Sequence, residues 1–259
     1  MSIADGKGTN TVLDRLVDYD QLSEFPEPEW LIDGWIPRPA LGALVAPPKA
    51  FKSFLALDLA CSIARVVPST LGAVKQYYEY GGSLGDDEPD RTNEVLYVIG
   101  EGVSGTAKRV RAWHDSRALD PIDSHTLFFH PGAVKLNDDR HVGELAHAVD
   151  RLKPALIVID TLARATTGAE ENSTKEMGPV IEVCDYLKTL GNSTVLLVHH
   201  TGKDTTKGAR GTNSILGALD FEITLQPAGS SVSVKRSEEH TSELQSHSDL
   251  VCRLLLEKK

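Results

Sequence analysis

Short runs made almost wholly of apolar residues alternate along the chain with stretches whose apolar residues recur at helical spacing. The runs lack a polar face, which predicts strands buried on both sides of a sheet. They cover residues 42–46, 94–100, 155–160 and 194–200. The stretches between them predict helices, at residues 52–65, 104–118, 140–152 and 175–190. Apolar strands that alternate with helices indicate an α/β fold, in which helices cover both faces of a mostly parallel, twisted sheet.

Other segments fall outside this alternation. Residues 1–28 are polar and rich in Asp and Glu, which predicts a mobile arm with one short helix at residues 11–19. Residues 75–93 are polar and contain paired glycines, which is typical of a long exposed loop. Residues 220–226 and 230–235 flank a turn that contains Pro and Gly, and they predict a C-terminal antiparallel hairpin.

Residues 236–259 resemble a translated sequencing adapter. A common short-read adapter, read in frame, gives residues 236–246, and the far end of the same adapter gives residues 250–259. The three residues between them lie where the variable index belongs. A genuine amphipathic helix is the alternative, but two matching blocks in the right order favour the adapter. We therefore exclude the segment from fold reasoning and expect residues 230–235 to be the last reliable element. We also expect the natural protein to continue beyond Lys235.

Composition narrows the class of protein. Hydrophobic residues make up 41% and charged residues 25% of the 259 residues, as in ordinary globular proteins. The three cysteines form no CxxC pair, which argues against a disulfide framework or a zinc knuckle and favours the cytoplasm. No apolar run is long enough to cross a membrane, and the first residues lack the layout of a signal peptide. Because the net charge is −10, any contact with nucleic acid needs a local basic patch.

The segment after the first apolar run resembles a phosphate-binding loop. Ligands of parallel sheets bind beyond the carboxyl ends of the strands. The loop pattern is GxxxxGK[ST], and Lys52 and Ser53 match its end, although Ala46 and Phe51 replace both glycines. The free amides of a helix N-terminus attract phosphate. Lys52 would add a charge for the β- and γ-phosphates, and Ser53 could bind Mg²⁺. The predicted nucleotide-binding residues are Ala46, Pro47, Pro48, Lys49, Ala50, Phe51, Lys52, Ser53 and Phe54.

Phe51 is the weak point of this interpretation. Loops of this type need backbone conformations with positive φ, which a bulky side chain disfavours. The alternative is a helix that simply begins with a solvated lysine.

Carboxylates follow two further apolar runs. Asp160 ends the run at residues 155–160, as in a Walker B strand whose carboxylate holds Mg²⁺. The alternative is that Asp160 caps the next element. Glu101 lies between two glycines after residues 94–100, where it could activate the attacking water. Alternatively, it complements the dipole of the helix that follows.

Two histidines and a basic loop follow the fourth run. His199 or His200 could contact the γ-phosphate and report its presence. A zinc site is not indicated, because no third ligand lies nearby in the sequence. A hydrogen-bonded structural histidine is the alternative. The loop at residues 203–214 carries Arg210 between glycines, which makes this residue a candidate arginine finger, acting in its own or a neighbouring subunit. A solvated turn is the other interpretation.

In order and spacing, these segments resemble the RecA-like ATPase core of the RepA-type hexameric helicases, a group within the AAA ATPases. The resemblance runs from about residue 30 to residue 235, through WLIDGWIPRPALGALVAPPKAFKSFLALDLACSIA, VLYVIGEG, LIVIDTLAR, VLLVHHTGKD and KGARGTNSILGALD. It implies a RecA-like P-loop NTPase core at residues 29–235 that binds ATP and Mg²⁺ and hydrolyses ATP. It also implies assembly of a homo-oligomer, commonly a hexameric ring, and work on single-stranded DNA.

The resemblance also implies roles for individual residues. Lys52 and Ser53 take the Walker A roles, and Asp160 takes the Walker B role. Glu101 activates the attacking water, and His200 or His199 senses the γ-phosphate. Arg210 acts as an arginine finger toward the next subunit. Residues 164–174 and 203–210 are the candidate DNA-contacting loops. The missing loop glycines depart from the family pattern, and they bear more on the rate of hydrolysis than on nucleotide binding.

Three functions remain open at this level. The first is a DNA-dependent ATPase motor, a helicase or a related replication ATPase. The second is a nucleotide-responsive DNA-binding or regulatory protein with little or no hydrolysis, which Phe51 and the acidic charge favour. The third is a recombinase-like protein that forms filaments on the same core.

Overall fold

The computed structural model describes residues 16–23, 29–75, 93–120, 126–169, 173–200, 215, 217–228, 231–237 and 250–252. The predicted N-terminal arm and the predicted loop at residues 75–93 therefore lie largely outside the described residues. In the described part of the arm, a short helix α1 (Tyr19–Ser23) begins where the predicted helix at residues 11–19 was expected to end.

A mixed sheet of eight strands forms the centre of the described structure, in the order β10-β9-β8-β3-β7-β6-β4-β5. Strands β8, β3, β7, β6, β4 and β5 are parallel to one another, and β9 and β10 continue the sheet in antiparallel pairing. The strands are β3 (Ala40–Ala46), β4 (Val95–Ile99), β5 (Leu127–Pro131), β6 (Leu156–Asp160), β7 (Thr194–His200), β8 (Phe221–Ala228), β9 (Ser231–Ser237) and β10 (Leu250–Cys252). Strands β1 (Glu29–Ile32) and β2 (Ile36–Arg38) form a separate small sheet.

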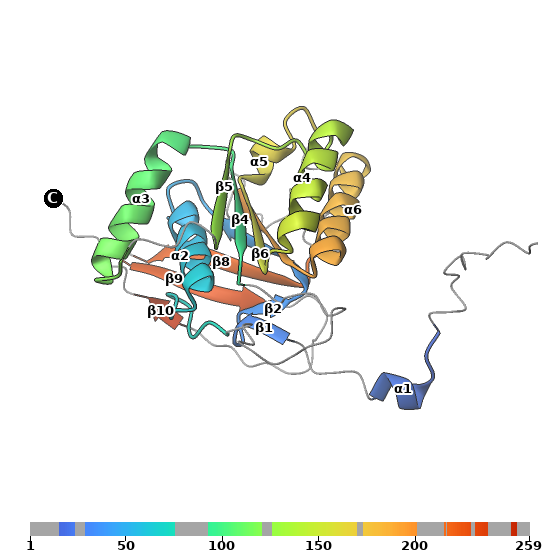
Figure 1. The fold of residues 1–259 in the computed structure, drawn as a ribbon, viewed down its shortest axis with the longest axis horizontal. Helices are drawn as coiled ribbons and strands as arrows, with labels where there is room; N and C mark the ends of the chain where they lie inside the picture. The colour runs from blue at the N-terminus through green and yellow to red at the C-terminus, as the bar shows by residue number, and fades with distance from the viewer. Residues whose placement is uncertain are drawn as a thin grey trace, which may run out of the picture.

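Helices cover both faces of the large sheet (Figure 1). Helices α2 (Lys52–Arg65) and α3 (Val103–Ser116) pack on one face. Helices α4 (Asp139–Leu152), α5 (Leu162–Ala165) and α6 (Thr174–Gly191) pack on the other. This arrangement confirms the predicted α/β fold with a mostly parallel sheet and a C-terminal hairpin. Among the described residues, no helix combines the length and the apolar character needed to cross a membrane.

The apolar strands divide their side chains between two cores. In β3, Leu44 and Ala46 belong to the core under α2 and α3, whereas Leu41, Ala43 and Val45 belong to the core under α4, α5 and α6. The reason is that successive side chains of a strand point to opposite faces. We call these the α2-side core and the α6-side core. Helix α2 is buried over most of its length, so its first residue is held firmly against the edge of the sheet.

The C-terminal end of the sheet differs from the prediction. Residues 230–235 were expected to be the last reliable element, but β9 continues to Ser237, and β10 pairs with it through Leu250–Val234, Val251–Ser233 and Cys252–Val232. An edge strand offers unpaired backbone groups, and any nearby extended segment can bond to them. Two parts of the adapter-like segment therefore take part in the sheet.

Gly42 of β3 lies opposite Phe221 of β8 in the register of the sheet. A Cβ atom at this position would lie 2.2 Å from the Cζ atom of Phe221, whose ring is fully buried. By contrast, a Cβ atom at Gly143 of α4 would have no heavy atom within 4 Å. The two glycines therefore form a matched pair, one required by packing and one not.

We expect Gly42→Ala to lower the free energy of unfolding by about 1–3 kcal/mol, because the ring of Phe221 has to move in a dense core. Gly143→Ala is expected to raise it by up to about 1 kcal/mol, because alanine favours the helix. Urea unfolding of the two variants and the parent chain measures both effects. A Gly42→Ala variant as stable as the parent would contradict the packing described here.

Candidate functional site

The carboxyl ends of β3, β4, β6 and β7 meet at one edge of the sheet. Ala46 of β3 lies opposite His200 of β7, and Asp160 of β6 lies beside Ile99 of β4 and Val198 of β7. Since Val158 and Val198 belong to the α2-side core, the strand alternation places Asp160 and His200 on the α2 side as well. Residues from separate parts of the sequence therefore gather beside the first turn of α2.

Lys52 is the first residue of α2, and its side chain is only 4% exposed. Its ammonium donates hydrogen bonds to the carbonyl oxygens of Ala46 and Pro47, both at 2.8 Å. Burial lowers the pKa of Lys52 to about 8, although the carboxylates of Asp160 and Glu101 oppose the shift. Among the described residues no carboxylate lies within ion-pair distance of Lys52, so the charge is not neutralised by direct contact.

Phe51 has the positive φ that a bulky side chain disfavours. It caps α2 with φ at 61°, and its carbonyl oxygen accepts hydrogen bonds from the amides of Phe54 and Leu55. Lys49 also has positive φ, at 66°. The ring of Phe51 packs against the α2-side core, with its centroid 5.9 Å from that of the Phe54 ring. The loop thus adopts left-handed conformations without glycine, at a cost of roughly 1–2 kcal/mol per residue.

Asp160 is 3% exposed and has two unlike oxygens. The Tyr97 hydroxyl donates a 2.7 Å hydrogen bond to Oδ2, whereas Oδ1 is buried with no hydrogen-bond partner in the described part of the chain. Burial raises the pKa of Asp160, and the hydroxyls of Tyr97 and Ser53 oppose that shift. The structure therefore brings Ser53 and Asp160 together. A hydroxyl oxygen and a buried carboxylate oxygen without a hydrogen-bond partner in the described part of the chain are ligands that suit Mg²⁺, so Ser53 and Asp160 fit that ion.

Glu101 follows β4, with its side chain about half exposed. Its Oε1 lies 3.4 Å from Nε of Arg164, which belongs to α5, and both side chains are in contact with solvent. Glu101 also acts electrostatically on Lys52, Asp160 and His200. Glu101 thus lies at the site, on the solvent side of the buried Lys52 and Asp160.

The two histidines point to opposite faces of the sheet. His200 is half-buried on the α2 side, and burial lowers its pKa, with Lys52 adding to the shift. His199 is 4% exposed on the α6 side, and burial lowers its pKa to about 4. Both histidines are therefore uncharged near neutral pH, and only His200 shares a face with Lys52. Arg210 and the basic loop around it lie outside the described residues.

Sequence reasoning missed two residues at this site. Tyr97 lies within an apolar run, where an aromatic residue looks like ordinary core. Burial raises its pKa well above the usual value, so its hydroxyl remains protonated. Arg109 of α3 places its guanidinium 5.6 Å from the centre of the Phe54 ring and close to Gly102. The sequence signal that could have identified Arg109 is the pair of glycines at positions 102 and 105, which lie beside its guanidinium.

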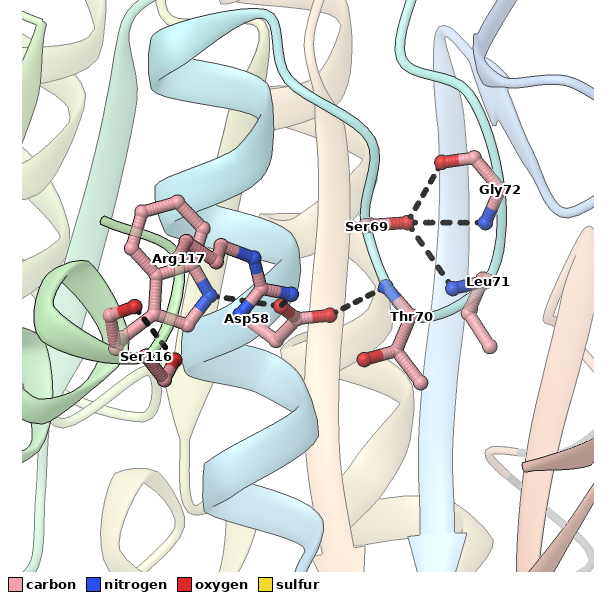
Figure 2. Close-up of polar contacts among 8 residues, drawn as sticks. Asp58, Ser69, Thr70, Leu71, Gly72, Ser116 and Arg117 are labelled. Atoms are coloured by element: carbon pink, nitrogen blue, oxygen red, sulfur yellow. Dashed lines mark hydrogen bonds and ion pairs between the residues drawn. The ribbon is translucent and has the colours of Figure 1, made fainter. Parts of the chain in front are cut away.

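A buried network fixes α2 against α3 (Figure 2). The carboxylate of Asp58, on α2, accepts hydrogen bonds from Trp113 Nε1 at 2.7 Å and from Arg117 at 2.6 Å. Its other oxygen accepts a bond from the amide of Thr70 at 2.7 Å. The Arg117 guanidinium also stacks 4.5 Å from the Trp113 ring centre. The two helices whose N-termini border the site are therefore tied together near the C-terminal end of α3.

Comparison with known proteins agrees with this geometry. A family model described as an AAA domain matches residues 9–206, which is more than half of the 259-residue chain. The match includes the loop before α2, Glu101, Asp160 and both histidines. No curated protein matches the chain. An AAA domain indicates a P-loop ATPase, which binds and hydrolyses a nucleotide, usually with Mg²⁺.

We expect polyphosphate binding to weaken as the pH rises through about 8, because Lys52 then loses its proton in the free protein. With a pKa of about 8, roughly a tenth of Lys52 remains charged at pH 9, so affinity falls up to about tenfold and binding takes up a proton. Calorimetry with ATP at pH 7 and 9, in two buffers of different ionisation enthalpy, measures both quantities.

Lys52→Arg is the matched control, because a guanidinium stays charged over this range. We expect it to remove the proton uptake at pH 9. Equal affinity at pH 7 and 9, with no proton uptake by the parent chain, would contradict this account of Lys52.

Proposed function

The chain belongs to the AAA domain family, and from this premise we propose that it is a Mg²⁺-dependent ATPase that uses ATP hydrolysis to act on DNA. The observation that carries the proposal is the buried ammonium of Lys52 at the N-terminus of α2, with Ser53 and Asp160 beside it. A buried cation that no carboxylate of the described residues contacts, at the N-terminus of a helix, favours a polyanionic ligand.

In the proposed mechanism, the loop before α2 holds the polyphosphate. The amides at the start of α2 and the Lys52 ammonium would bind the β- and γ-phosphates. Ser53 and Asp160 would hold Mg²⁺. When bound, the ion neutralises charge on the phosphate oxygens. The hydrogen bonds from Lys52 to Ala46 and Pro47 hold the ammonium in place before the ligand arrives.

Glu101 is the proposed base for the attacking water. Its carboxylate is solvent-accessible and follows the end of β4, with the Arg164 guanidinium 3.4 Å away. His200 is the proposed contact to the γ-phosphate. Because its pKa is lowered, it is neutral at pH 7, and one ring nitrogen then carries a proton that it can donate. His199 faces the other core, so we assign the sensing role to His200.

The finer proposal is a RepA-like helicase or a related replication or recombination ATPase. Its support is the order and spacing of five motifs from the loop before α2 to Arg210. A ring would place Arg210 of one subunit at the nucleotide of the next, and single-stranded DNA is the proposed partner. Since the chain carries a net charge of −10, contact with DNA would depend on local cations such as Arg164.

A regulatory protein with little hydrolysis is the second candidate. Two observations favour it. Phe51 replaces the glycine that usually gives the loop its freedom and has φ at 61°. In addition, Arg164 forms an ion pair with the carboxylate proposed as the base, so this carboxylate already has a partner other than the attacking water.

Phosphate release with and without single-stranded DNA, together with ATP binding, separates these functions. We expect Lys52→Ala to abolish both binding and turnover. Glu101→Gln should bind ATP like the parent and hydrolyse it about 10²–10⁴-fold more slowly, because it keeps the shape and loses the base. Lys175→Ala, on the exposed surface of α6, removes a lysine elsewhere and should behave like the parent.

Each contrary outcome has a distinct meaning. Unchanged turnover in Lys52→Ala would defeat the ATPase mechanism. Tight ATP binding that alters DNA affinity, with negligible phosphate release by the parent, would establish the regulatory alternative. Negative-stain images of the parent with ATP and DNA distinguish closed rings from the open filaments of a recombinase.

A further inference from the structure

Tyr97 and Asp160 form a buried pair between neighbouring strands. Tyr97 lies on β4 and Asp160 on β6, and the register places Ile99, two residues after Tyr97, beside Asp160. Both side chains face the α2 side, with exposures of 2% and 3%. The tyrosine hydroxyl thus reaches along the strand and donates to Oδ2 of the carboxylate at 2.7 Å.

The pair leaves the carboxylate asymmetric. Oδ2 is satisfied by Tyr97, whereas Oδ1 is buried and accepts no hydrogen bond from the described residues. Leaving a buried carboxylate oxygen without a partner is unfavourable. A carboxylate whose second oxygen is held by another group can present the first in one fixed direction, which is how outer partners orient the ligands of a metal ion.

The ring of Tyr97 is itself held in place. Its centre lies 5.7 Å from that of Phe129 on β5, and β4 lies between β5 and β6 in the sheet. The hydroxyl therefore has little freedom to leave Asp160. A phenylalanine at position 97 would keep the ring packing and lose only the hydrogen bond.

We propose that Tyr97 is a positioning residue that fixes Oδ2 of Asp160 and thereby leaves Oδ1 for Mg²⁺ at the nucleotide site. This inference rests on the proposed function, because it assumes that Asp160 serves a nucleotide-bound ion. It goes further by assigning one oxygen of the carboxylate to the ion and the other to a residue that does not touch the ligand.

The test separates the Mg²⁺-dependent part of ATP binding from the rest. ATP affinity of the full chain is measured by calorimetry over a range of Mg²⁺ concentrations and in EDTA. Tyr97→Phe should raise the Mg²⁺ concentration needed for half of the effect by about 10–100-fold. Binding in EDTA should stay unchanged. Tyr186→Phe removes a hydroxyl from the exposed surface of α6 and should match the parent in both conditions.

Two further variants protect the conclusion. 3-Fluorotyrosine introduced at position 97 keeps the hydroxyl and should retain the Mg²⁺ requirement of the parent, even if Tyr97→Phe folds poorly. In an Asp160→Asn background, Tyr97→Phe should cause no further change in Mg²⁺ requirement, because the tyrosine acts through that carboxylate.

A parental Mg²⁺ requirement in folded Tyr97→Phe would overturn the inference and leave the ATPase proposal standing. If Tyr97→Phe loses the same ATP affinity with Mg²⁺ and in EDTA, the inference is also overturned, because the Tyr97–Asp160 hydrogen bond then has only a structural role. A raised Mg²⁺ requirement in the fluorotyrosine variant would do the same. If the parent binds no ATP in either condition while remaining folded, the proposed function fails, and this inference fails with it.

Discussion

The buried ammonium of Lys52 is the constraint on which the rest of the site depends. Burying a charge costs free energy unless an opposite charge or several dipoles compensate it. Here two carbonyl oxygens satisfy the ammonium, and no carboxylate within the described residues contacts it directly. The pKa of Lys52, lowered to about 8, shows that these contacts offset only part of the free-energy cost of burying the charge. An anion at the start of α2 would repay that cost, which gives the site its preference for phosphate.

The surrounding structure keeps this costly arrangement in place. Helix α2 is buried along most of its length, and Asp58 ties it to α3 through Trp113 and Arg117. This anchoring also explains how the preceding loop can keep Lys49 and Phe51 at positive φ. Strain of a few kcal/mol is tolerated only where the neighbouring structure determines the conformation. The loop therefore reproduces with ordinary residues a shape that glycines usually provide.

Much of the fold could be predicted from sequence because apolar runs and helical spacing follow directly from burial. The positions of Lys52, Ser53 and Asp160 followed as well, since functional groups in parallel sheets occur just after the strands. Tyr97 could not be found, because its role depends on the pairing of β4 with β6. The choice of His200 over His199 likewise needed the register of β7, since adjacent residues of a strand differ only in the face they occupy. Strand β10 was not predicted because it lies in the segment excluded for its resemblance to a translated adapter, and its pairing with β9 appears only in the structure.

A crystal structure of the full chain with Mg²⁺ and a non-hydrolysable ATP analogue tests the central claim most directly. We expect the β-phosphate at the N-terminus of α2, within hydrogen-bond distance of Lys52 Nζ, and the ion between Ser53 and Oδ1 of Asp160. A nucleotide bound elsewhere, with Lys52 still bonded to Ala46 and Pro47 and no anion beside it, would contradict the account.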